Sequence, residues 1–109
     1  MTTSTTRIHG QAAPRERFQR LAGEWKQRSR HMSNTAQMAM LRPYQKIIGM
    51  GVDAVPLILE ELQREPDQWF WALEAITEAN PVPAEAAGRV RLMADAWIEW
   101  GRQHGFIPS

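Results

Sequence analysis

The segment from Tyr44 to Leu73, YQKIIGMGVDAVPLILEELQREPDQWFWAL, most constrains how this chain can fold. Gly49 and Gly51 end one apolar stretch, and Pro66 separates the next from the aromatic run that follows. The apolar residues are too dense for any one of the resulting helices to be stable alone. The segment therefore predicts short helices that share one core.

The flanking sequence extends this pattern to the whole chain. Phe18, Leu21, Ala22 and Trp25 recur at helical spacing and predict an amphipathic helix over residues 14–30, opened by Pro14. Further helices are expected after the capping residues 33–35, at 43–48, from the Asp53 cap to Pro66, from the Asp67 cap to about residue 79, and over 84–103. No alternating strand pattern occurs. We expect an all-α, compact bundle of five or six short helices, with residues 14–109 as one domain behind a flexible Thr/Ser-rich tail, residues 1–13.

One part of this pattern resembles a known repeat. The string IIGMGVDAVPLILEEL is similar to the turn and second helix of HEAT-type helical repeats, with small turn residues, an Asp cap, a Val-Pro pair and a Leu/Ile run. The match covers about one repeat, whereas stacked arrays need roughly three to be stable. The resemblance therefore implies a HEAT-like helical hairpin in the middle of a compact fold.

Several unusual strings occur in order between Phe18 and Phe106: EWK, YQKIIGMG, AVPLIL, DQWFWAL, NPVP and AWIEWG. Together they resemble a family of short, uncharacterised bacterial proteins. The resemblance implies a bacterial or phage origin and an α-helical fold, and it implies no activity.

Composition excludes several classes of site. The chain has 109 residues and no cysteine, which rules out disulfides, thiolate metal ligands and cysteine nucleophiles. No apolar run approaches the roughly 18 residues of a membrane-spanning helix, and the first residues do not resemble a secretory signal. We expect a cytoplasmic protein without a membrane partner.

Charge is distributed unevenly although the net charge is only +1. Residues 1–49 carry nine Lys/Arg and two Asp/Glu, whereas residues 50–80 carry one Arg and seven Asp/Glu. The basic part could face nucleic acid or an acidic partner. Alternatively, it packs beside the acidic part of the same molecule or of a second copy.

No set of residues predicts catalysis or a cofactor. His9, His31 and His104 lack the spacing of a zinc site, and we expect no metal. Ser33 lies near His31, but neither a nucleophile elbow nor a strand to carry one is present, so Ser33 is better explained as a helix cap. Only His31, Glu24 and Tyr44 could be placed near a pocket. We therefore expect a non-enzymatic protein.

Nucleic-acid binding is the alternative function. Basic residues crowd the first amphipathic helix and could neutralise phosphates: Arg15, Arg17, Arg20, Lys26, Arg28 and Arg30. Trp25 among them could stack on a base, but it shares the apolar stripe with Phe18 and Leu21, which favours a place in the core. The next helix is apolar and Met-rich, unlike a base-reading helix.

Five tryptophans in so short a chain favour either a protein interface or a central helix, residues 67–73, with other helices packed on every side. Trp69, Phe70 and Trp71 are consecutive and cannot all face one side of a helix, because successive residues lie about 100° apart. We expect Trp69 and Phe70 in the core. Trp71 and Trp100, with the mildly repelling pair Glu74 and Glu78, are the candidate binding residues. The leading hypothesis is a protein-binding module, such as a regulator, inhibitor or antitoxin-like partner of a protein encoded nearby; a second copy of the chain is another candidate partner.

Overall fold

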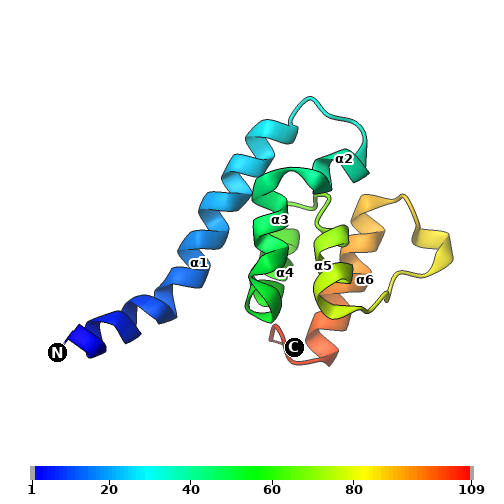
Figure 1. Ribbon diagram of the computed structural model, residues 1–109. Coiled ribbons are helices and arrows are strands. Elements are labelled where there is room, and N and C mark those ends of the chain that lie inside the picture. The colour runs from blue at the N-terminus through cyan, green and yellow to red at the C-terminus, as the bar shows by residue number, and fades with distance from the viewer. Residues whose placement is uncertain (1, 109) are drawn as a thin grey trace. The chain divides into compact units, whose positions relative to one another are not determined.

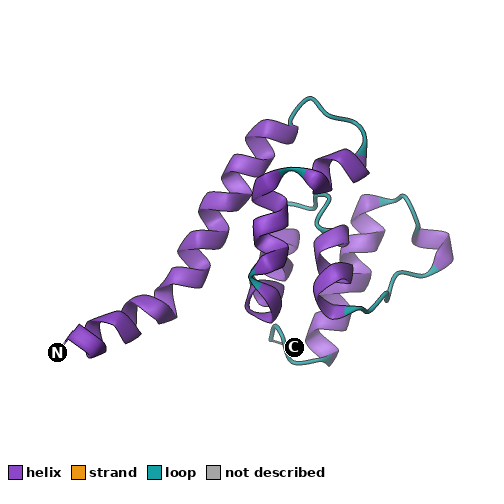
Figure 2. Ribbon diagram, viewed as in Figure 1, coloured by secondary structure: helices purple, strands orange, loops and turns teal. Residues whose placement is uncertain are grey.

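The computed structural model describes residues 2–108, and it describes the side chains of residues 13–108. Within this part the chain forms helices and no strand, so the predicted all-α fold is confirmed (Figures 1 and 2). The six α-helices are α1 (Thr2–Ser29), α2 (Thr35–Met40), α3 (Arg42–Gly49), α4 (Ala54–Arg64), α5 (Phe70–Thr77) and α6 (Val90–Gln103). Two short 3-10 helices, η1 (Gly51–Asp53) and η2 (Ala84–Ala86), precede α4 and α6.

The chain divides into two compact units, Met1–Ala54 and Val55–Ser109. We call them the first unit and the second unit. The first holds α1, α2, α3 and η1, and the second holds α5, α6 and all but the first residue of α4. A single domain over 14–109 stays a prediction. The predicted tail falls largely on residues whose side chains lie outside the described part, and its flexibility also stays a prediction.

The first unit is built on the contact between α1 and α3. Phe18, Leu21 and Trp25 of α1 are buried, as the helical spacing predicts. The Trp25 ring lies 5.2 Å from the Tyr44 ring of α3, and its Nε1 donates a 2.9 Å hydrogen bond to the Met38 carbonyl of α2. One indole therefore joins all three helices of this unit.

Two predictions of helix starts are wrong. Pro14 does not open a helix, because α1 begins at Thr2 and contains Pro14; proline has no N–H to donate, so a helical hydrogen bond is missing there. Asp67 does not cap α5. Its Oδ1 accepts from the Gln68 N–H at 2.7 Å and its carbonyl accepts from the Trp69 N–H, which forms a turn before the helix. By contrast, Asn34 caps α2 by accepting from the Gln37 N–H at 3.0 Å.

In the second unit, α6 starts six residues later than the sequence pattern predicts. Gly88 has a φ of +82°, a left-handed conformation that suits glycine, and Ala87 has a ψ of 132°, outside the helical region. These two residues separate η2 from α6 and end the helical path from Ala84. Further along α6, Gly101 is buried against Leu59 of α4 and Ile107. An ideal Cβ on Gly101 would lie only 2.5 Å from Leu59 Cδ1.

This close approach generates a prediction. Gly101→Ala should destabilise the protein by about 1 kcal/mol, because the overpacking exceeds the gain in helix propensity. Gly23→Ala in α1 is the matched control. Nothing lies within 4 Å of its Cβ position, so this variant should be stabilised by about 0.5–1 kcal/mol. Urea denaturation measures both, and equal shifts of the two variants would contradict the close packing of α6 on Leu59.

Candidate interaction surfaces

The outward face of α5 carries an exposed tryptophan. Trp71 is 52% exposed, whereas Phe70 and Leu73 of the same helix are buried. At about 100° per residue, Glu74, Ala75 and Glu78 lie on the side of Trp71, and all three are exposed. We call Trp71, Glu74, Ala75 and Glu78 the α5 face.

The burial of the neighbouring aromatic residues explains why Trp71 points outward. Trp69 just before α5 is fully buried and Phe70 is 3% exposed, as predicted. Both are buried and so anchor the start of α5. The next side chain is turned by about 100° and leaves that core. The exposure of Trp71 thus follows from the position of its two neighbours.

The end of the α5 face has an unusual backbone. Glu78 follows α5 with a φ of 58°, the left-handed conformation that an L residue adopts at a cost of roughly 1–2 kcal/mol. Its N–H donates to the Glu74 carbonyl at 2.8 Å, which closes the last turn. Thr77 Oγ1 donates to the Leu73 carbonyl and accepts from the Ala79 N–H, so this turn is held from both sides.

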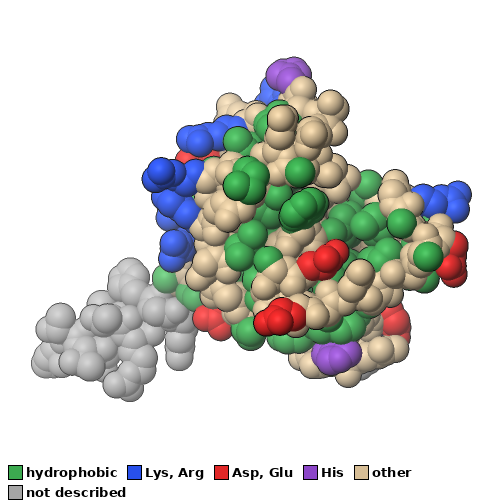
Figure 3. All heavy atoms as spheres, turned by 45° about the vertical axis from the view of Figure 1, so that its right-hand side comes forward, with side chains coloured by type: hydrophobic (Ala, Val, Ile, Leu, Met, Phe, Trp, Pro, Cys, Tyr) green, Lys and Arg blue, Asp and Glu red, His purple; other side chains and the backbone are tan. Residues whose placement is uncertain are grey.

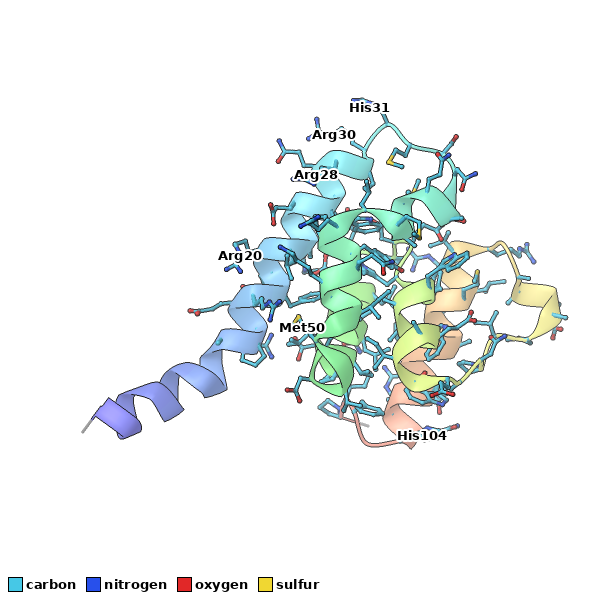
Figure 4. All side chains as sticks on the ribbon, in the orientation of Figure 1. Arg20, Arg28, Arg30, His31, Met50 and His104 are labelled. Atoms are coloured by element: carbon cyan, nitrogen blue, oxygen red, sulfur yellow. The ribbon has the colours of Figure 1, made fainter. Side chains whose placement is uncertain are left out.

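Trp100 lies in a cluster of aromatic rings at the end of α6. Its ring centroid is 5.3 Å from that of buried Trp97, and the two planes are nearly perpendicular. His104 and Phe106 stack on Trp100 at centroid distances of 4.4 and 5.4 Å. The ring of His104, labelled near the end of α6 in Figure 4, also contacts the Trp100 carbonyl through Nδ1 at 2.8 Å. Trp100 is therefore half-buried and held by its own unit, in contrast to Trp71.

The basic residues of α1 and of the turn that follows it are mostly exposed. Lys26 is half-buried and the five arginines are exposed: Arg15, Arg17, Arg20, Arg28 and Arg30. Figure 3 shows basic side chains gathered along one edge, and in Figure 4 Arg20 and Arg28 extend from α1 away from α3. Arg17, Arg20 and Arg28 lie within about 80° of one another around the helix, and no ion pair joins them to any described residue. We call these three arginines the α1 stripe.

Two residues of the nucleic-acid hypothesis, Arg30 and Trp25, do not lie together with the exposed arginines of α1. Arg30 lies in the turn after α1, which ends at Ser29, and so does not belong to the α1 stripe. Trp25 is fully buried, and its Nε1 is bonded to the Met38 carbonyl, so its ring is not available to stack on a base. The exposed arginines remain as the basis of that hypothesis.

A shallow depression of about 200 Å³ lies in the first unit, lined by Ala13, Pro14, Arg17, Met50 and Asp53. It is smaller than the roughly 300–1,000 Å³ typical of small-molecule sites. One guanidinium and one carboxylate line it, without a histidine or hydroxyl beside them. The lining does not form a recognisable catalytic set.

The three residues that the sequence allows near a pocket differ in burial. Tyr44 is fully buried, whereas Glu24 and His31 are exposed, and Figure 4 shows His31 at the turn after α1. Among the described residues, no three His, Cys, Asp or Glu side chains gather as a metal site would require. The side chain of His9 is outside the described part. None of the helices in the described part is both long enough and apolar enough to span a membrane.

Comparisons with known proteins gave no match: no family model, no curated protein and no solved structure is similar to this chain.

The three tryptophan environments predict a ranking of stability. Trp71→Ala should cost about 1 kcal/mol or less, because half of the ring is already in water. Trp100→Ala should cost more, because each stacked pair contributes about 0.5–1.5 kcal/mol. Trp25→Ala should cost about 3–5 kcal/mol through cavity formation and the lost hydrogen bond. Chemical denaturation gives the order, and a loss at Trp71 equal to that at Trp25 would identify Trp71 as a core residue.

Proposed function

We propose that this protein is a non-enzymatic protein-binding module whose binding surface is the α5 face. The observation that carries the proposal is the exposure of Trp71 on the same helix face as two unpaired carboxylates, Glu74 and Glu78. Tryptophan is enriched at the energetic centres of protein interfaces, because its large rigid ring buries much area at low entropic cost. Neither Glu74 nor Glu78 has an ion-pair partner among the described residues.

The α5 face also concentrates several local costs to stability. Glu78 holds a left-handed backbone conformation, and glycine is the usual residue there. Its negative charge lies at the C-terminal end of a helix, where cations are favoured. Glu74 and Glu78 are four residues apart and repel each other. Local costs of this kind cluster at functional sites, so their coincidence with Trp71 supports a binding role.

The chemistry of this face favours a basic partner. An arginine or lysine placed over the Trp71 ring would gain a cation–π interaction, and the two carboxylates would add charge-assisted hydrogen bonds. A partner segment that offers basic and apolar side chains together would satisfy all three groups.

Nucleic-acid binding is the second candidate function. The observation in its favour is the α1 stripe, which extends over about 16 Å of helix and has no described ion partner. Such binding would weaken steeply as salt rises from low to physiological concentration. Filter binding of duplex DNA and single-stranded RNA across this range separates the two functions.

The cost at Glu78 can be measured directly. Glu78→Gly should raise the free energy of unfolding by about 0.5–1 kcal/mol, because glycine adopts a positive φ without strain. The same variant should weaken partner binding, because it removes one carboxylate of the α5 face. Glu85→Gly, at another exposed acid of the second unit, is the control and should not affect binding. Unchanged binding by Glu78→Gly would remove this residue from the site.

Site-specific photo-crosslinking tests the surface itself. A photoreactive phenylalanine analogue placed at position 71 should give a discrete protein adduct in cells that produce the protein naturally. The analogue at position 85, which is also exposed, is the matched control. Mass spectrometry of the adducts identifies the partner and the contact. Equal or absent crosslinking at the two positions would contradict the proposal.

A further inference from the structure

We infer that the α5 face binds α1 of a second copy of this chain, with the α1 stripe of one copy lying on Trp71, Glu74 and Glu78 of the other. This inference rests on the proposed function, because it names the partner of the same surface. It is carried by the complementary charge and spacing of two exposed helix faces.

The two units have opposite charge. The first unit contains nine Lys/Arg and three Asp/Glu, whereas the second contains four Lys/Arg and nine Asp/Glu. Formal charges of +6 and −5 follow, so each copy contains one strongly basic and one strongly acidic unit. Opposite potentials of this kind attract two copies and orient them so that unlike units meet.

The exposed charges also match at the scale of single helix turns. Arg17 and Arg20 are three residues apart on α1, so about one turn separates them. Glu74 and Glu78 are separated by about one turn at the end of α5. Both pairs lack an ion partner within the described residues. Two guanidiniums could therefore meet two carboxylates when the helices lie against each other.

Trp71 makes arginine the fitting partner for this face. Guanidinium groups stack on indole rings more readily than ammonium groups do, because they are planar and weakly hydrated. The α1 stripe consists only of arginine. Trp71 and Glu74 are three residues apart, the same spacing as Arg17 and Arg20, so one guanidinium can cover the half-exposed indole while the other pairs with the Glu74 carboxylate.

A second copy is the occupant because each chain carries both halves of the contact. Any two copies therefore offer each other complementary surfaces. A foreign basic protein would satisfy the α5 face but would leave the α1 stripe unpaired.

Analytical ultracentrifugation of the full chain tests this inference. The wild-type protein should show reversible self-association between low micromolar and about 1 mM concentration, and raising the salt to 0.5 M should weaken it. Arg17→Glu/Arg20→Glu and Glu74→Arg/Glu78→Arg should each weaken self-association about tenfold or more. Glu85→Arg/Asp95→Arg is the matched control: it reverses two exposed acids elsewhere in the second unit and should leave association within about threefold of wild type.

Mixing the two weakened variants gives the decisive result. The reversed α1 of one variant is complementary to the reversed α5 face of the other, and the two unaltered surfaces remain complementary. An equimolar mixture should therefore form a heteromer at concentrations where each variant alone is monomeric. Glu74→Gln/Glu78→Gln provides a milder test should a reversed variant fail to fold by circular dichroism.

Three results would overturn the inference: a wild-type chain that stays monomeric throughout, double reversals that associate like wild type, or a mixture that does not restore association. The proposed function fails separately. A monomeric chain whose position 71 crosslinks to a different protein would leave the α5 face as a binding site and assign it another partner.

Discussion

Three consecutive aromatic residues at the start of the eight-residue helix α5 determine which side chains of that helix are exposed. Successive side chains on a helix differ by about 100°, so the burial of two neighbours turns the third outward. Trp69 and Phe70 lie in the core, and Trp71 is left with half of its ring exposed. The orientation of α5 and the position of its carboxylates follow from the same constraint. The proposed binding surface is thus a consequence of how the core is anchored.

The same residue type has a different role in the first unit. Trp25 is on an apolar stripe whose members all lie on one side of α1, so nothing forces it outward. Its Nε1 finds an acceptor in the Met38 carbonyl, and its ring packs on Tyr44. A buried indole with a satisfied N–H stabilises contact between helices, whereas an exposed indole beside unpaired carboxylates suits recognition. Position in the helical repeat, and not tryptophan content, distinguishes the two roles.

Periodicity along the chain was sufficient to predict most of the helices, the burial of Phe18, Leu21 and Trp25, and the Asn34 cap region. Periodicity did not predict the break between η2 and α6, because no proline ends the helical pattern there. Gly88 follows alanines and looked like part of a helix, and only its positive φ shows the break. The turn at Asp67 and the stacking of His104 and Phe106 on Trp100 depend on contacts that sequence spacing does not encode. Spacing predicts that one of the three consecutive aromatic residues leaves the core, and the burial of Trp69 and Phe70 shows that this residue is Trp71.

The boundary between the two compact units falls close to the point where the sequence changes from basic to acidic. The basic and acidic parts of the chain change over near residue 50, and the boundary between the compact units falls at Ala54. The net charge of the whole chain is only +1, so the charges are separated between the units without giving the chain a large net charge. The exposed arginines on one side of α1 and the carboxylates beside Trp71 each lack an ion partner among the described residues. Because each group is the complement of the other, the chain carries on its own surface the chemistry that its binding face would recognise.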